Sequence, residues 1–131
     1  MERSIIKEGN FLIIEEKNPI NKIVRFQLKN HDKILACAEI SSACDIWIFN
    51  RMYVSEENRA KGYGSEVLTK LTAYLDRKKM DLYAYIYSTG SLREKQLDAW
   101  YRRHGFEDDA EKGYPLARYA ADRKPNFQIE E

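Results

Sequence analysis

The segment Val54-Ser-Glu-Glu-Asn-Arg-Ala-Lys-Gly-Tyr-Gly-Ser65 joins a strand-like run of residues to a helix-like run through two closely spaced glycines. Glycines at 62 and 64 allow the backbone to approach a ligand closely, and the first N–H groups of the following helix point outward at the positive end of the helix dipole. Arg59 and Lys61 can add charge-assisted contacts to phosphate oxygens. The segment therefore predicts a phosphate-binding site, although a strand-to-helix turn with solvated charges would use similar residues.

Two common phosphate-binding loops do not fit this segment. A Walker A loop requires a glycine, four residues and then Gly-Lys-Ser/Thr, and the chain contains no such run. The dinucleotide fingerprint Gly-x-Gly-x-x-Gly fails because Val67 stands where its third glycine should be. The pattern that remains is Arg59-x-x-Gly62-x-Gly64.

A second motif, Trp100-Tyr101-Arg102-Arg103-His104-Gly105-Phe106, ends a helix-like segment. Together with Arg59-x-x-Gly62-x-Gly64, it resembles the GCN5-related N-acetyltransferase (GNAT) superfamily. That superfamily has an Arg/Gln-x-x-Gly-x-Gly/Ala loop followed by an aromatic-Tyr-x-x-x-Gly-Phe motif, in this order. The resemblance runs from about Asp45 to Phe106, which is roughly half of the chain.

The resemblance implies acetyl-coenzyme A as cosubstrate, no metal, and direct transfer of an acetyl group to an amine in a ternary complex. The backbone of Met52, Tyr53 and Val54 would bind the pantetheine arm, and the N–H of Tyr53 or Val54 could stabilise the oxyanion. Tyr101 would donate a proton to the departing thiolate. The residues implied to hold the pyrophosphate are Arg59, Ala60, Lys61, Gly62, Tyr63, Gly64 and Ser65.

The general base is not carried over from the family. Where some members have a carboxylate on the strand before the loop, this chain has Ile48, which cannot accept a proton. Water-mediated deprotonation is one alternative. A non-catalytic acyl-coenzyme A-binding module, acting as a sensor or interaction protein, is therefore the competing interpretation. The candidate bases are Glu39, Asp45, Glu94 and His104. A solvated surface charge, or for His104 a capping or packed side chain, is the more ordinary explanation of each.

The apolar patterns predict a single α/β (α+β) domain. Its mixed sheet is mostly antiparallel, with a parallel strand-helix-strand crossover at the coenzyme site. Richness in Ile, Val, Phe, Trp and Tyr between turn residues predicts the first four strands, and alternation predicts the strand at 81 to 87. Apolar spacing on one face predicts the helices. The expected strands cover residues 11 to 16, 22 to 29, 33 to 41, 45 to 54, 81 to 87 and 114 to 120, and the expected helices cover residues 65 to 79 and 92 to 104.

One departure from the family concerns the acceptor site. The superfamily fold places one or two helices between its first two strands, where they help to form the acceptor site. Here the corresponding gap contains only Lys17-Asn-Pro-Ile-Asn21. Either those helices are reduced or absent, or the first strand is misassigned, so the acceptor cannot be inherited from the family.

Length and charge limit the remaining possibilities. The 131 residues suit one domain, with a coenzyme-binding core at about 45–106 and a polar tail at about 121–131. The 22 basic and 21 acidic residues give a net charge of +1, which favours neither nucleic acid nor a membrane surface as partner. We expect a cytoplasmic protein, because no apolar run resembles a signal peptide or a membrane span. Cys37 and Cys44 are expected to be reduced structural thiols, and a homodimer could supply the missing acceptor wall.

Overall fold

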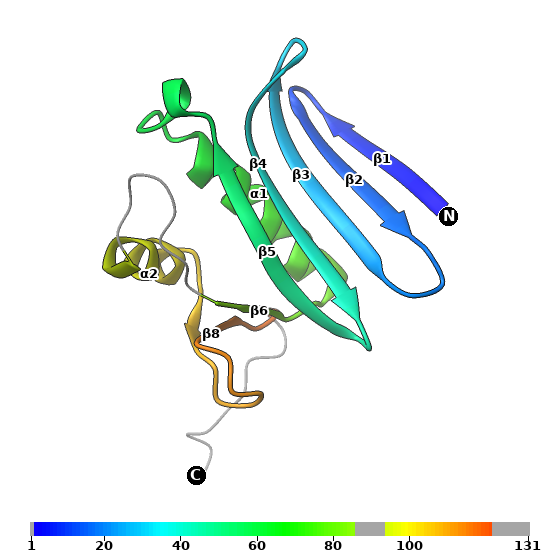
Figure 1. Cartoon of the computed structure of the whole chain (residues 1–131), viewed down its shortest axis with the longest axis vertical. Helices are drawn as coiled ribbons and strands as arrows, with labels where there is room; N and C mark the ends of the chain where they lie inside the picture. The colour runs from blue at the N-terminus through cyan, green and yellow to red at the C-terminus, as the bar shows by residue number, and fades with distance from the viewer. Residues whose placement is uncertain (1, 86–93, 122–131) are drawn as a thin grey trace.

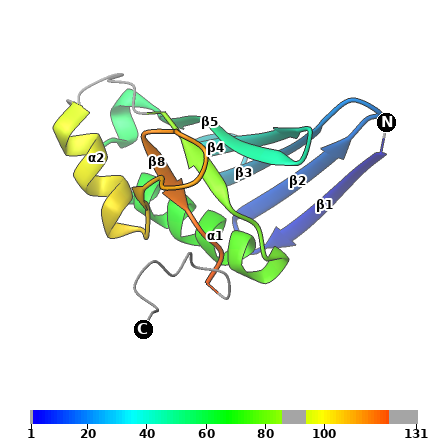
Figure 2. The same cartoon turned by 90° about the horizontal axis from the view of Figure 1, so that it is seen from below.

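The computed structural model describes residues 2–85 and 94–121, which form one sheet with both described helices on the same face (Figures 1 and 2). The strands are β1 (Glu2–Glu8), β2 (Phe11–Lys17), β3 (Lys22–Asn30), β4 (Lys33–Ala43), β5 (Ile46–Val54), β6 (Leu82–Ala84), β7 (Glu107–Asp108) and β8 (Leu116–Arg118). The helices are α1 (Tyr63–Lys78) and α2 (Glu94–Arg103), and a 3-10 turn, η1 (Glu56–Asn58), precedes α1.

The sheet confirms the predicted fold class. Within the described residues, eight strands lie in the order β1-β2-β3-β4-β5-β6-β8-β7. Strands β1 to β5 form an antiparallel meander, and β5 pairs in parallel with β6 after the crossover through α1. The helices expected at 65 to 79 and 92 to 104 correspond to α1 and α2. Residues 86–93 and 122–131 lie outside the described residues, and they include part of the strand expected at 81 to 87 and most of the tail.

The core lies between α1 and the meander. The helix buries one face because its apolar residues recur every three or four positions, and the strands contribute alternate residues to the same layer. Tyr74 of α1 also donates a hydrogen bond to Glu15 of β2, which fixes the helix across the sheet. The fully enclosed members of this core include Phe26, Ala36, Ile40, Val67, Leu68, Leu71, Leu75, Leu82 and Leu116.

Several elements and boundaries differ from the sequence prediction. The strand expected at 114 to 120 is limited to β8, which has three residues. Strand β1 was not expected, because its residues are mostly polar and exposed and its pairing with β2 supplies what its own pattern lacks. The two-residue strand β7 was missed as well. Helix α1 begins at Tyr63 rather than at Ser65, because the left-handed Gly62 is the residue that precedes the first turn.

A tight turn replaces the acceptor-site helices. Between β2 and β3, the Asn18 side chain accepts hydrogen bonds from the N–H groups of Ile20 and Asn21 at 2.8 and 2.9 Å. Such a turn uses the whole of the short connection, so the predicted first strand was assigned correctly and the intervening helices are absent. As a result, no described helix covers the second face of β1 to β5 (Figures 1 and 2).

The cysteines and the acidic and histidine residues of the described chain form neither a disulfide nor a metal cluster. Cys37 is half-buried and Cys44 is exposed, and both are free thiols. Residues 2–85 and 94–121 contain no cluster of three or more His, Cys, Asp or Glu residues that could hold a metal ion. Among the same residues, no helix has both the length and the apolar character needed to cross a membrane.

Candidate functional site

The candidate site begins where β5 leaves β6. In the described part of the chain, the ladder between these two strands has one register pair, Ile48 with Tyr83. The pairing of β4 with β5 shifts after Glu39, so Asn50 is an extra residue on β5 and forms a β-bulge. Bulges occur often next to active sites because they bend a strand and interrupt its pairing. The predicted pantetheine-binding segment, residues 52 to 54, therefore follows a bend and lies beyond the only described pair with β6.

The loop between β5 and α1 leaves the N-terminus of α1 open to an anion. Gly62 has a left-handed backbone (φ 82°) and directly precedes α1 without giving it a side-chain cap. An added Cβ at Gly62 would meet no atom within 4 Å. The first N–H groups of any α-helix lack intrahelical acceptors, which here concerns Tyr63, Gly64 and Ser65. The open approach at Gly62 and these outward amides fit the binding of a phosphate group.

The second glycine of the motif has closer neighbours than the first. A Cβ at Gly64 would lie 3.3 Å from Val54 Cγ2 and 3.5 Å from Trp100 Cζ2. The missing side chain at Gly64 therefore lets the first turn of α1 pack closely against the end of β5 and helix α2. Of the two motif glycines, Gly62 is the one that leaves space for a ligand.

The two basic residues of the loop have different surroundings. Arg59 is half-buried, and its Nε donates a hydrogen bond to the Val54 carbonyl at 3.2 Å, which ties the loop to the end of β5. Lys61 is exposed, as is Ala60, which has a left-handed backbone with φ 65°. Two cavities among the described residues, of about 300 and 430 Å³, are lined by neither this loop nor Tyr101. The loop therefore offers backbone amides and charges rather than an enclosed pocket.

Tyr101 packs at the edge of the core, on the side of α2 that faces β5. Its ring contacts Phe49 edge-on at 5.5 Å and also contacts Phe106 at 5.4 Å between centroids. The residue is 8% exposed. No hydrogen bond of the Tyr101 hydroxyl to another described residue is present. Among the described residues, Asn21 Oδ1 is the one fully enclosed side-chain polar atom that has no hydrogen-bond partner. The Tyr101 hydroxyl, without a partner in this part of the chain, is therefore not fully enclosed, and it is accessible to solvent or to a ligand.

Burial raises the pKa of Tyr101 to about 12. The phenol is therefore protonated throughout the neutral range. A coenzyme thiol has a pKa near that of cysteine, about 8.5, so full proton transfer from this phenol to the thiolate would be uphill by roughly 5 kcal/mol. The predicted proton donor is thus better suited to donate a hydrogen bond to a developing thiolate than to release its proton completely.

A contact that the sequence did not reveal connects the two motifs. Trp100 Nε1 donates a hydrogen bond to Ser65 Oγ at 2.9 Å, across 35 residues of sequence. The same indole ring packs against Tyr101 at 5.3 Å and edge-on against His104 at 5.7 Å. Because Ser65 lies in the first turn of α1, Trp100 links the predicted phosphate loop, residues 59 to 65, to the helix that carries Tyr101. The signal was the tryptophan N–H itself, a donor that needs a partner when it is buried.

Two of the candidate bases, Asp45 and Glu39, are poorly placed to accept a proton near residues 52 to 54. Asp45 precedes β5 in an exposed turn, roughly 23 Å along the strand from Met52. Glu39 lies beside the bulge, but its two oxygens accept hydrogen bonds from Arg25 Nε at 3.2 Å and from Asn50 Nδ2 at 3.0 Å. Asp45 is therefore too distant from Met52, and Glu39 would have to break a hydrogen bond before it could accept a proton.

The other two candidate bases are Glu94, at the start of α2, and His104, which directly follows α2. His104 is half-buried and has a lowered pKa, first because of burial and then because of the charges of Arg103 and Arg118, so it is neutral at pH 7. It contacts Trp100 rather than the phosphate loop. Glu94 begins α2, but its side chain lies outside the described residues. A neutral His104 could accept a proton, and no described contact assigns it that role.

Comparisons with known proteins agree with this geometry. Residues 7–108 match the family model described as the acetyltransferase (GNAT) domain. None of the curated proteins matches the sequence significantly. The fold is also similar to that of several solved structures, among them three acetyltransferases with 20% identity or less, a level at which similarity shows the fold alone.

The first of these structures is the PaiA N-acetyltransferase from Thermoplasma acidophilum in complex with coenzyme A, with 15% identity and a TM-score of 0.57 over 74% of this chain and 60% of that chain. The ribosomal-protein-S18-alanine N-acetyltransferase from Escherichia coli has 18% identity and a TM-score of 0.54 over 85% and 67% of the two chains. An acetyltransferase from Bacillus cereus has 20% identity and a TM-score of 0.58 over 76% and 74%. The chain thus spans about two thirds or less of the first two relatives.

Proposed function

Because the chain belongs to the GNAT acetyltransferase domain family, we propose that it is an acetyl-coenzyme A-dependent N-acetyltransferase that transfers the acetyl group directly to an amine in a ternary complex. The observation that carries the proposal is the uncapped start of α1 behind Gly62, where the backbone is left-handed and open to a ligand. We assign residues 1–131 to one domain, with the coenzyme-binding core at about 45–106.

The residues present fit the coenzyme. The amides of Tyr63, Gly64 and Ser65 would hold the pyrophosphate at the positive end of the helix dipole, with Arg59 and Lys61 adding charge. Arg59 already ties the loop to Val54, so the loop and the end of β5 keep a fixed relation. The backbone of residues 52 to 54 would orient the pantetheine arm. The coenzyme supplies an activated acetyl thioester, and the protein contributes mainly placement, which can lower a barrier by several kcal/mol.

Tyr101 would stabilise the sulfur as it departs. Its hydroxyl stays protonated because its pKa is about 12, and it has no competing hydrogen bond with a described residue. A donor aimed at developing negative charge is worth about 100-fold in rate or more when it is removed. The N–H of Tyr53 or Val54 would act in the same way on the thioester oxygen. The acceptor in its ammonium form could lose a proton to water or to His104, and the neutral amine would then attack the thioester carbonyl.

A non-catalytic coenzyme-binding module is the second candidate. It is favoured by one observation: the Glu39 carboxylate beside the bulge is engaged by Arg25 and Asn50 rather than free to act as a base. Such a module would bind acetyl-coenzyme A through the same loop but release no thiol in the presence of amines.

The test is a thiol-release assay with acetyl-coenzyme A and a broad panel of small amines and peptides. We expect turnover with at least one amine, and a loss of about 100-fold in kcat for Tyr101→Phe with nearly unchanged coenzyme affinity. Tyr83→Phe is the matched control, because Tyr83 is also buried but packs against Tyr114 and Tyr119 on the other face of the sheet. Coenzyme binding without turnover on any amine would favour the module, and no coenzyme binding would reject both functions.

A further inference from the structure

The uncovered face of the meander carries a defined set of side chains. We call it the open face. Because side chains alternate along strands, register places alternate residues of β1 to β5 on this face, opposite α1. Figures 1 and 2 show that no described helix lies over it. Its members from the five strands include Arg3, Ile5, Lys7, Leu12, Ile14, Glu16, Ile23, Arg25, Gln27, Lys29, Cys37, Glu39, Ser41, Ile46, Ile48, Arg51 and Tyr53.

The open face has an excess of positive charge. It carries five cations and two carboxylates, an excess of three positive charges on a chain whose net charge is only +1. Both carboxylates are already engaged. Glu16 pairs with Arg3 and Arg25, and Glu39 pairs with Arg25. The positive charge that is left over is therefore concentrated on the other three cations, Lys7, Lys29 and Arg51.

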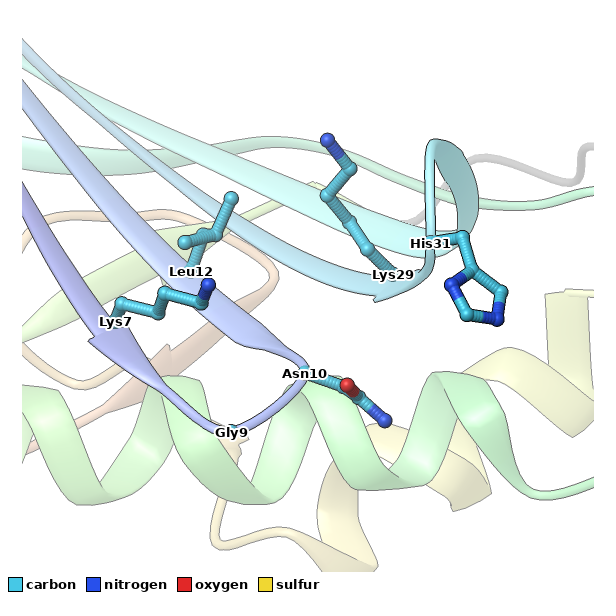
Figure 3. A pocket seen from close by; sticks show the side chains of 6 residues that line it. All are labelled: Lys7, Gly9, Asn10, Leu12, Lys29 and His31. Carbon is cyan, nitrogen blue, oxygen red and sulfur yellow. The ribbon is translucent and has the colours of Figure 1, made fainter.

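These three cations lie towards the end of the sheet that also carries the phosphate loop. Within the described residues, none of them forms an ion pair. Lys7 and Lys29 line a cavity of about 300 Å³ with Leu12 and His31 (Figure 3). Figure 3 shows the side chains of Lys7, Leu12 and Lys29 on the side of the sheet opposite the helix. Arg51 lies on β5 across from Glu39.

We propose that the open face binds an acidic segment of a polypeptide, and that an amine of this polypeptide is the acceptor of the acetyl group. The acceptor role rests on the proposed function. Tyr53 supports it, because this residue belongs to the open face and also to the segment assigned to pantetheine. A polypeptide bound along the face would therefore reach the reacting end of β5.

The mixture of side chains favours a polypeptide over other anionic partners. Ile5 and Tyr53 are 56% and 51% exposed, and they provide apolar surface between the charges. Glu16 and Glu39 interrupt the positive charge of the face. A nucleic acid presents a continuous line of phosphates to both carboxylates, whereas a polypeptide can place its acidic side chains only at Lys7, Lys29 and Arg51. A second copy of the chain is disfavoured as well, because a two-fold contact through this face would bring equal positive charges together.

The experiment measures binding of two peptides to the coenzyme A-loaded protein by fluorescence anisotropy. Both peptides have 12 residues, a blocked N-terminus and one central lysine; one has Asp and Glu around the lysine, and the other has Asn and Gln. Exposed ion pairs each contribute about a twofold effect, so three of them predict about tenfold tighter binding of the acidic peptide at low salt. This preference should disappear at high salt.

Matched triple variants locate the effect. In Lys7→Gln/Lys29→Gln/Arg51→Gln the preference for the acidic peptide should be lost while coenzyme A affinity is unchanged. The control Lys22→Gln/Lys70→Gln/Lys78→Gln removes the same charge from the helix side of the sheet and should keep the preference. With an active enzyme, the acidic peptide should also show the lower KM.

Several results would overturn the proposal. These are equal or absent binding of the two peptides, a preference that survives in the open-face variant, tighter binding of a DNA or RNA oligonucleotide than of the acidic peptide, or a dimer that the open-face substitutions dissociate. Failure of the proposed function is distinguishable, because it would appear as absent coenzyme A binding in the unmodified protein, which is measured separately.

Discussion

Replacing Trp100 with phenylalanine should weaken coenzyme binding although the side chain is not expected to touch the coenzyme. The substitution removes the N–H that donates to Ser65 Oγ at 2.9 Å but keeps an aromatic ring against Tyr101 and His104. A partly buried hydrogen bond contributes about 1 kcal/mol. The lost part of the indole includes the atoms packed against Gly64, which adds up to about 1 kcal/mol.

Together these terms predict a loss of about 1–2 kcal/mol in the free energy of unfolding. Because Ser65 and Gly64 lie in the first turn of α1, a looser turn should also lower coenzyme A affinity by up to about tenfold. Ser65→Ala should produce a smaller loss of similar kind, since it removes the acceptor and leaves the indole N–H without this partner.

A double-mutant cycle separates the hydrogen bond from general packing. Urea unfolding and calorimetric titration with coenzyme A are measured for Trp100→Phe, Ser65→Ala and the double variant. We expect a coupling energy of about 1 kcal/mol between the two sites. Trp47→Phe is the control, because the other tryptophan of the chain lies at the start of β5, away from the loop, and should leave coenzyme affinity unchanged. Additive effects within about 0.3 kcal/mol, or full coenzyme affinity in Trp100→Phe, would refute the reasoning.

Three further substitutions test other parts of the structure. Gly62→Ala and Gly9→Ala should each lower the free energy of unfolding in urea by about 1 kcal/mol, because both glycines have a positive φ and open space around an added Cβ. Only Gly62→Ala should also weaken coenzyme A binding. Equal coenzyme A affinities of the two variants would contradict the assignment of the loop. The pKa of Tyr101 is raised to about 12, above about 10 in the unfolded chain, so the protonated phenol stabilises the fold below pH 10 and this stabilisation is lost as the pH rises towards 12. In pH-dependent unfolding, Tyr101→Phe should therefore reduce the loss of stability at alkaline pH by up to about 2–3 kcal/mol. An unchanged pH profile would count against the buried phenol. Arg118→Gln should lower the free energy of unfolding by about 2 kcal/mol, because it removes a bidentate pair with Asp76 at 2.9 and 3.0 Å; a loss below about 0.5 kcal/mol would show that the pair contributes little.

The sequence predicted those elements whose own pattern determines them. Strands β2 to β5 are rich in apolar residues and are separated by turn residues, and α1 repeats apolar residues at helical spacing, so local composition and periodicity were sufficient. Strand β1 shows the limit of this reasoning. It lies at the edge of the sheet with most side chains exposed, and it is a strand because β2 offers it backbone hydrogen bonds. Such tertiary pairing leaves little trace in the pattern of a strand.

The site shows the same division. The left-handed Gly62 and the start of a helix follow from short-range geometry, which the motif contains. The contact between Trp100 and Ser65 depends on how α2 docks against α1, and the raised pKa of Tyr101 depends on packing against Phe49 and Phe106. These features require the three-dimensional arrangement. The bulge at Asn50 was missed because a single extra residue does not change the composition of a strand.

Nuclear magnetic resonance titration of the labelled protein tests the anion-binding helix terminus most directly. Backbone amide shifts would be followed on adding coenzyme A and, separately, pantetheine, which lacks the phosphates. We predict that coenzyme A causes large shifts at the amides of Tyr63, Gly64 and Ser65, and that pantetheine leaves these three almost unchanged. Unperturbed amides at these residues with saturating coenzyme A, or equal shifts with both compounds, would contradict a phosphate site at the start of α1.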